Sequence, residues 1–250
     1  MQQVSQFLDV LVGPTCSQSL LKFEYTNIPC LKLLLSKALG LGIIFGSVLL
    51  KVPQILNILS LKSTKGISMG SYLIETWAFL IVLAYNLRRN NPFSTYGEGF
   101  FITCQNIIIL LMMLYYQKAS LSSFMLLLAS FALSGILFSP LFPAPVLSYL
   151  QLSTLFLALG SKCPQIYVNF KNKSTGALSF ITLALQFLGT LARIFTTIQE
   201  VKDPMILGSF ILAGVLNGSL VLQWIIYRRT SKDEKIKKTK AGKLAKKKNQ

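Results

Sequence analysis

Seven long apolar stretches constrain the fold of this chain more than any other feature of its sequence. They cover residues 33–61, 68–87, 100–116, 121–138, 146–170, 178–198 and 205–227. A bilayer core about 30 Å thick is crossed by roughly 20 helical residues, and each stretch is close to that length. Helices are required because lipid offers no hydrogen-bond partner to the backbone. The sequence therefore predicts an all-α polytopic membrane protein with seven transmembrane helices.

The composition also indicates a membrane protein. Hydrophobic residues make up 52% of the chain and charged residues 13%, whereas soluble domains carry roughly 25% charged residues. The net charge of +17 comes mostly from one end, because eleven of the 25 Lys and Arg lie between Arg228 and Lys248. A basic tail beside a membrane span is typical of a cytosolic anchor. Nucleic acid is therefore not predicted as a partner.

A motif that occurs twice divides the chain into repeats. Residues 51–55 (KVPQI) recur as residues 162–166 (KCPQI), 111 positions further on. The same offset, without insertion, pairs Ser68 with Ser179, Gly97 with Gly208, Asn106 with Asn217 and Tyr116 with Tyr227. Three crossings end on the far side of the membrane, and a lone fourth helix restores the starting side. The sequence therefore predicts a 3+1+3 plan of parallel repeats, related by an axis along the membrane normal.

The distribution of basic residues predicts the orientation. One side carries the basic tail and Lys62, Lys65, Lys118, Lys171 and Lys173. The other side carries Lys22, Lys32, Lys37, Arg88, Arg89 and Lys202, partly offset by Asp9, Glu24, Glu200 and Asp203. Cytosolic loops are enriched in Lys and Arg, so the C-terminus is expected in the cytosol and the N-terminus in the lumen.

Five parts are expected from this plan. They are an N-terminal lumenal or interfacial segment (1–32), a first three-helix repeat (33–117), a linker helix (120–140), a second repeat (144–227) and a basic cytosolic tail (228–250). Lys247 and Lys248 match a dilysine pattern for retrieval to the endoplasmic reticulum. A Lys-rich tail can also place two lysines there by chance.

Each repeated motif puts a proline and a glutamine inside a span: Pro53 and Gln54, then Pro164 and Gln165. Proline removes one helical hydrogen bond and disturbs the carbonyl four residues earlier. We expect the neighbouring glutamines to donate to the freed carbonyls, which would make each motif a hinge. The alternative is that the prolines only shape helix packing.

Lys51 and Lys162 are the candidate ligand-binding cations. Lys51 lies roughly 16 Å along the helix from Lys62 at 1.5 Å per residue, and an ionisable residue inside a span is a functional-site hypothesis by default. Two lysines at matched positions suggest an anionic ligand, whereas an ion pair with Glu75 or Glu98 is the structural alternative. Further polar candidates at membrane depth are Asn106, Gln186 and Asn217, which suit either sugar contacts or contacts between helices.

Catalysis finds little support in the sequence. The chain has no histidine, no paired-carboxylate spacing and no nucleophile motif, so we expect no enzyme, no metal and no cofactor. Its four cysteines include no CxxC pair. Free thiols are favoured over a bridge between Cys16 and Cys30.

These features resemble the PQ-loop family, which includes SWEET sugar transporters, cystinosin-type exporters and KDEL receptors. Within it, several strings resemble the mannose-P-dolichol utilization defect proteins: residues 28–32 (IPCLK), 35–42 (LSKALGLG), 51–54 (KVPQ), 91–98 (NPFSTYGE) and 191–200 (LARIFTTIQE). The resemblance covers about residues 28–227.

The resemblance implies a multi-pass protein of the endoplasmic reticulum needed to use mannose- and glucose-phosphate-dolichol. These lipids feed N-glycan precursors, GPI anchors and related lumenal mannosylation. Flipping, presenting or chaperoning the lipid would each fit, with the lipid as ligand and dolichol-dependent glycosyltransferases as candidate partners. The alternatives are a transporter of a small sugar or amino acid, and a scaffold for those transferases.

Overall fold

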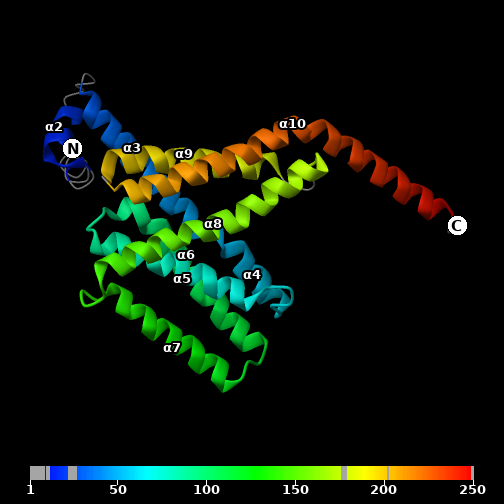
Figure 1. The fold of residues 1–250 in the computed structure, drawn as a ribbon, viewed down its shortest axis with the longest axis horizontal. Coiled ribbons are helices and arrows are strands. Elements are labelled where there is room, and N and C mark those ends of the chain that lie inside the picture. Colours follow the sequence, from blue (N-terminus) through cyan, green and yellow to red (C-terminus); the bar gives the residue numbers. More distant parts are fainter. Residues whose placement is uncertain (1–8, 10–11, 22–26, 176–178, 202, 249–250) are drawn as a thin grey trace. The chain divides into compact units, whose positions relative to one another are not determined.

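The computed structural model describes residues 9, 12–21, 27–175, 179–201 and 203–248, the last 21 of these as backbone only. All the regular elements in these residues are helices (Figure 1). Seven are long and apolar enough to cross a membrane, namely Ile28–Leu61, Met69–Arg88, Phe93–Tyr116, Leu121–Phe138, Ala144–Asn172, Phe180–Glu200 and Pro204–Tyr227. The predicted all-α fold with seven spans is confirmed.

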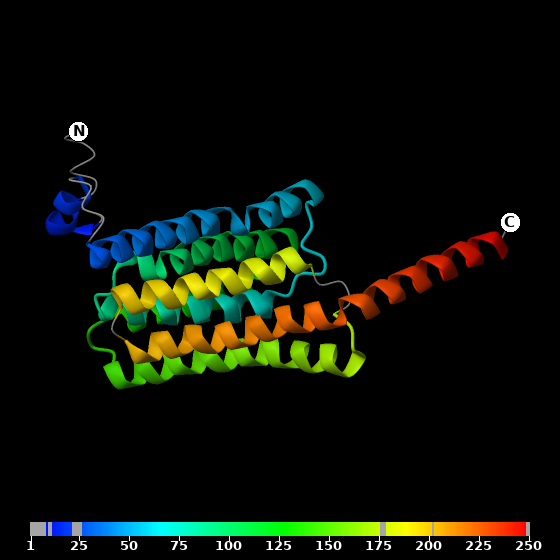
Figure 2. The same cartoon turned by 90° about the horizontal axis from the view of Figure 1, so that it is seen from above.

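The first span consists of two helices. Helix α3 (Ile28–Leu50) ends at Lys51 and α4 (Val52–Leu61) begins directly after it, with Pro53 in its first turn. Proline is tolerated there because a first-turn N–H has no partner within the helix. Figure 2 shows the blue α3 passing into the cyan α4 through this short break.

The remaining helices follow the predicted order. They are the short α2 (Pro14–Leu21), α5 (Met69–Arg88), α6 (Phe93–Tyr116), α7 (Leu121–Phe138), α8 (Ala144–Asn172), α9 (Phe180–Glu200) and α10 (Pro204–Lys248). Polar side chains cap three helix starts, since Asn27, Ser68 and Ser120 each accept a hydrogen bond from the backbone N–H three residues later. Such caps satisfy N–H groups that the helix leaves unpaired.

The chain forms two compact units. The first contains residues Met1–Thr154 and Phe195–Asp203, and the second contains Leu155–Ile194 and Pro204–Gln250. In the first unit, α6 packs against α5, α3 and α4, and α7 packs against α5. Its core is a set of buried apolar side chains: Ile58, Tyr72, Ile109, Leu110, Met113, Leu114 and Leu127. The third helix of this repeat therefore lies between the other two.

Two glycines allow α3 and α6 to approach closely. A Cβ atom added to Gly40 would lie 3.1 Å from the Cβ of Ser94. One added to Gly97 would lie 2.7 Å from a ring carbon of Phe93 and 2.8 Å from the Cδ1 of Ile44. Any larger residue at Gly97 must displace these side chains.

The second unit has a similar internal arrangement, because α10 contacts both α8 and α9. Asn169 of α8 donates to Gln223 of α10 at 3.1 Å, and Asn217 of α10 donates to Thr190 of α9 at 2.8 Å. The α8–α9 loop also matches its counterpart. Lys62 and Lys173 occupy equivalent positions in the duplication, and both have a left-handed backbone, with φ of 47° and 49°.

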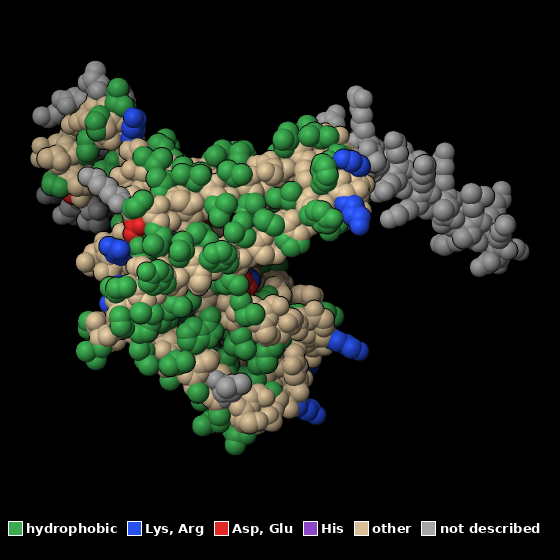
Figure 3. All heavy atoms as spheres, viewed as in Figure 1, with side chains coloured by type: hydrophobic (Ala, Val, Ile, Leu, Met, Phe, Trp, Pro, Cys, Tyr) green, Lys and Arg blue, Asp and Glu red, His purple; other side chains and the backbone are tan. Residues whose placement is uncertain are grey.

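The outer surface is apolar. On the face shown in Figure 3, hydrophobic side chains cover the helices along their length. Large exposed residues include Phe45, Phe156 and Ile181, each at least 67% exposed. A soluble protein rarely exposes such continuous apolar area, whereas lipid solvates it without cost.

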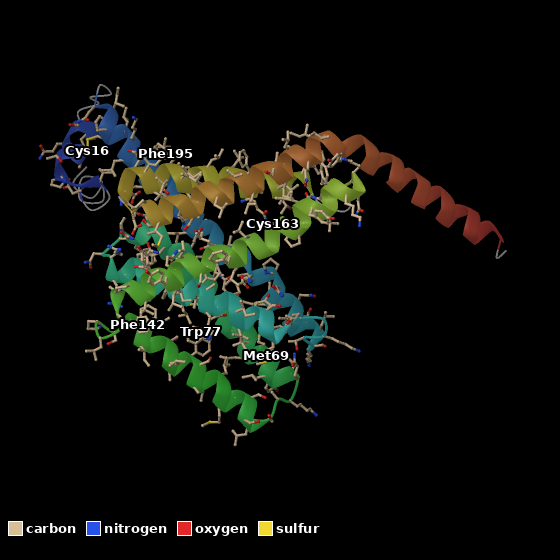
Figure 4. The ribbon with its side chains drawn as sticks, viewed as in Figure 1. Cys16, Met69, Trp77, Phe142, Cys163 and Phe195 are labelled. Atoms are coloured by element: carbon tan, nitrogen blue, oxygen red, sulfur yellow. A yellow bond between two sulfur atoms is a disulfide. The ribbon has the colours of Figure 1, made fainter. Side chains whose placement is uncertain are left out.

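The expectation of free thiols at Cys16 and Cys30 was wrong. These cysteines form a disulfide that joins α2 to the start of α3, and Figure 4 labels Cys16 at this place. The sequence could not show that α2 folds back onto α3, which brings the two Cα atoms to 5.3 Å. Cys104 and Cys163 are free and exposed.

Candidate functional site

The break in the first span is held by a glutamine from another helix. Gln105 of α6 accepts a hydrogen bond from the backbone N–H of Lys51 at 2.8 Å. Its amide nitrogen donates to the carbonyls of Ser47 and Val48 at 2.9 and 3.0 Å. One buried side chain therefore satisfies three backbone groups at the end of α3, each of which would be costly to leave unpaired in lipid.

Gln54 does not hold the break as predicted. Its side-chain oxygen instead accepts a hydrogen bond from the Tyr72 hydroxyl at 2.6 Å, which links α4 to α5. Nothing in the sequence favoured Gln105 over Gln54 as the side chain that holds the helix break, because Gln105 lies 54 positions beyond Lys51.

The second motif lies in an uninterrupted helix. Helix α8 runs from Ala144 to Asn172 with Pro164 inside it, and Gln165 is half-buried. Close to the motif, Gln223 of α10 donates to the Ile166 carbonyl at 2.9 Å. Each repeat thus uses a glutamine of its third helix on a carbonyl of its first. These glutamines are not equivalent in the duplication, so sequence alignment of the repeats does not reveal them.

Lys51 forms an ion pair with Glu75, which was the structural alternative to ligand binding. Its Nζ lies 3.0 and 2.9 Å from the two carboxylate oxygens of Glu75 on α5. It also lies 4.7 Å from the centre of the Tyr72 ring. The lysine side chain is 14% exposed and the glutamate side chain 38%. The cation of the first repeat is therefore neutralised inside the protein.

Lys162 has a different partner. Its Nζ donates to the side-chain oxygen of Gln186 on α9 at 2.9 Å. Gln186 stands 24 residues after Lys162, just as Glu75 stands 24 residues after Lys51. The two pairs are equivalent in the duplication, but the second contains a neutral amide. Within the described ranges, no carboxylate forms an ion pair with Lys162.

The two equivalent asparagines lie in the third helix of each repeat. Asn106 on α6 is fully buried, and neither of its amide atoms has a hydrogen-bond partner among the described residues. Asn217 on α10 donates to Thr190, while its oxygen has no partner in the same part of the chain. Buried polar groups without partners are uncommon, so both amides can still accept further hydrogen bonds.

Each unit also contains an apolar pocket. In the first, a pocket of about 320 Å³ lies between α5 and α7, where Met69 and Trp77 are labelled in Figure 4. In the second, a pocket of about 490 Å³ is lined by Cys163, Ile166, Tyr167, Phe170, Leu216 and Gln223. The linings suit hydrocarbon better than a hydrated solute.

A buried carboxylate cluster was not predicted. Glu200, at the end of α9, accepts hydrogen bonds from Ser36 and Ser94 and lies 2.6 Å from the Lys37 Nζ. Its side chain is 3% exposed. Nearby in sequence, Asp203 accepts a 2.7 Å hydrogen bond from Tyr85. The sequence placed Lys37 and Glu200 on the same side of the membrane but could not pair them.

The remaining candidates concern the tail and metals. The backbone of α10 continues to Lys248, and the side chains of Lys247 and Lys248 lie outside the described residues. No group of three or more His, Cys, Asp or Glu that could hold a metal occurs in the part of the chain that the structure describes.

The duplication and the spans agree with comparisons to known proteins. The PQ-loop repeat family model matches twice, at residues 35–95 and 146–206. The chain therefore carries two PQ-loop repeats within a multi-pass membrane fold.

Two known proteins are similar to this chain. Human solute carrier family 66 member 3 is 26% identical over 185 residues, which are 73% of this chain and 89% of that protein. The structure of a eukaryotic SWEET transporter superposes with a TM-score of 0.62 at 16% identity, and the match covers 78% of this chain and 97% of the transporter. The SWEET likeness establishes the fold. The families found are transporter-like rather than enzymatic.

Proposed function

We propose that this protein enables the use of mannose-phosphate-dolichol and glucose-phosphate-dolichol at the endoplasmic reticulum, for N-glycans, GPI anchors and related glycosylation. It acts without catalysis, by flipping, presenting or chaperoning the lipid. Candidate partners are the glycosyltransferases that consume these lipids. The proposal rests on the sequence strings that resemble the mannose-P-dolichol utilization defect proteins and on the polar groups inside the spans.

The observation that carries the proposal is a half-buried cation within the first helix of the second repeat, with no carboxylate partner among the described residues. Lys162 lies roughly 16 Å along α8 from Lys173, and its described partner is the neutral Gln186. A dolichyl-phosphate sugar combines one phosphodiester charge with a long apolar chain. It could therefore neutralise Lys162 while its chain remains in lipid or in an apolar pocket.

The N-terminal disulfide supports the proposed orientation. Disulfides persist in oxidising compartments such as the lumen of the endoplasmic reticulum. Cys16 precedes the first span, and Cys30 lies in the first turn of that span. Basic loops and a basic tail on the opposite side are consistent with the cytosol.

The test is complementation of cells that lack this protein. A Lys51→Ala, Lys162→Ala double variant, expressed at the normal level, is expected to leave lumenal mannosylation defective. Lys65→Ala is the matched control, since it removes a positive charge from an exposed loop and should restore mannosylation fully. Full rescue by the double variant would contradict the proposal.

A transporter of a small sugar or amino acid is the second candidate. It is favoured by the likeness to solute carrier family 66 member 3 and to a SWEET transporter. Uptake into proteoliposomes separates the two functions. A saturable flux of a small solute, unaffected by dolichyl-phosphate sugars, would support the transporter.

A further inference from the structure

The two repeats differ in charge at one pair of equivalent positions. In the first repeat, Lys51 meets both oxygens of Glu75. In the second, Lys162 meets the amide oxygen of Gln186 at a similar distance, 2.9 Å. The helices thus bring the same two positions together in each repeat, and only the chemistry of the partner has changed.

The membrane-spanning part of the second unit supplies no negative charge either. Residues 155–194 and 204–227 contain Lys162, Lys171, Lys173 and Arg193 but neither Asp nor Glu. The first unit, in contrast, pairs its inner basic groups with Glu75 and Glu200. An ammonium group without a counter-charge is costly inside a span, and an amide oxygen offsets only part of that cost because it carries no net charge.

We infer that Lys162 and Gln186 form a binding site for a phosphate monoanion, whereas Lys51 and Glu75 form a permanent structural ion pair. The inference deepens the proposed function and rests on it for the lipid, because it assigns the phosphodiester of a dolichyl-phosphate sugar to the second repeat alone. Lys162 supplies the charge, and Gln186 holds the ammonium group while its amide N–H₂ remains available to a phosphate oxygen.

Gln186 is then a specificity-determining residue. A glutamate at this position would have nearly the same shape but would bind Lys162 as Glu75 binds Lys51. The internal carboxylate would occupy the ammonium group and repel an incoming phosphate. The chain provides the matched control, because Glu75→Gln converts the first repeat to the residue pair of the second.

The experiment measures equilibrium binding to the full-length protein in nanodiscs of neutral lipid. The probe is tritiated dolichyl-phosphate mannose, with unlabelled dolichol and mannose 1-phosphate as competitors. The variants are Gln186→Glu and Glu75→Gln, with thermal unfolding recorded to confirm that each is folded. We expect Gln186→Glu to weaken binding at least tenfold and Glu75→Gln to bind at least as well as wild type.

Four outcomes decide the inference. Binding by Gln186→Glu equal to wild type would overturn the inference. Competition by neutral dolichol as strong as competition by unlabelled dolichyl-phosphate mannose would also overturn it. Binding of mannose 1-phosphate alone, lost in Gln186→Glu, would support the phosphate site but contradict the lipid function. Weakened lipid binding by Gln186→Glu, together with full rescue of mannosylation by that variant in deficient cells, would likewise support the site and contradict the proposed function.

Discussion

Gln105 shows how much a single side chain can contribute to a broken span. Three backbone groups at the end of α3 depend on it, namely the N–H of Lys51 and the carbonyls of Ser47 and Val48. Gln105 itself is 8% exposed, so water cannot readily replace its hydrogen bonds. Its role is structural, since it fixes the position of Lys51 and hence the ion pair with Glu75.

Replacing Gln105 with leucine is expected to destabilise the protein strongly. The substitution keeps the volume but leaves buried backbone groups without partners, at about 1–3 kcal/mol for each group. The loss is measured as a lower midpoint of thermal unfolding in detergent. Cys104→Ser is the control, because Cys104 is the preceding residue on α6 and is exposed. An unchanged midpoint for Gln105→Leu would show that the break is held in another way.

The sequence predicted Lys51 and Glu75 as possible partners but did not predict the donor to the broken helix. Local reasoning favoured Gln54, since it adjoins Pro53. The observed donor depends on how α6 packs against α3, and that packing is decided by distant residues such as Gly40 and Gly97. Opposite charges can be matched from the sequence alone. A hydrogen bond between helices far apart in the sequence can be predicted only when it is known how each helix is rotated about its axis.

At the scale of elements, the end of α9 is anchored to the first repeat by two acidic residues. Glu200 is buried and contacts Ser36, Lys37 and Ser94 of α3 and α6. Asp203 directly precedes α10, and its Oδ2 is 3.9 Å from the Nε of Arg89, whose side chain is 57% exposed. The two anchors therefore differ greatly in their exposure to solvent.

Removing the two anchors is expected to lower the free energy of unfolding by different amounts. Glu200→Ala leaves the Lys37 ammonium group partly buried without its partner, which typically costs 3–5 kcal/mol. Arg89→Ala removes an exposed, long-distance pair and should cost less than about 1 kcal/mol. Thermal unfolding of both variants tests the difference. A Lys37→Ala, Glu200→Ala double variant should recover part of the loss, and equal effects of the two single variants would contradict this assignment.

The contact between α3 and α6 depends on the absence of a side chain at Gly97. Gly97→Ala places a methyl group within 2.8 Å of Ile44 and Phe93, so the helices must separate or the side chains must move. Overpacking of this kind costs about 1–3 kcal/mol. Gly42→Ala on α3 is the control, because nothing lies within 4 Å of its added Cβ, and it should be neutral or slightly stabilising. Equal unfolding midpoints would show that the contact adjusts freely.

For the whole molecule, the sequence predicted the class of fold well because lipid permits so few alternatives. The apolar lengths required helices, and the constant offset required two repeats. The differences between the repeats were harder to predict. The helix breaks at Lys51 but continues through Pro164, and an ion pair in one repeat corresponds to an amide contact in the other. Nearly equal motifs thus perform different tasks because their surroundings differ.

The orientation of the whole chain can be tested through its two ends. An odd number of spans places the ends on opposite sides, the Cys16–Cys30 disulfide favours an oxidising compartment for the N-terminus, and the basic tail favours the cytosol for the C-terminus. Glycosylation reports these sides directly, because acceptor sites are modified only in the lumen. The substitutions Gln3→Asn and Lys237→Asn create such sites, Asn-Val-Ser and Asn-Lys-Thr, near the two ends.

We expect Gln3→Asn to acquire a glycan and Lys237→Asn to remain bare, as seen by migration on a gel before and after endoglycosidase H. Sensitivity of that glycan to the enzyme would also indicate residence in the endoplasmic reticulum. Adding Lys247→Ser and Lys248→Ser to Gln3→Asn should make part of the glycan resistant, because loss of dilysine retrieval allows passage to later compartments. A glycan on the Lys237→Asn variant would show the opposite orientation, and the charge difference between the loops on the two sides would then need another explanation. A fully sensitive glycan in the combined variant would show that the tail lysines do not retrieve the protein.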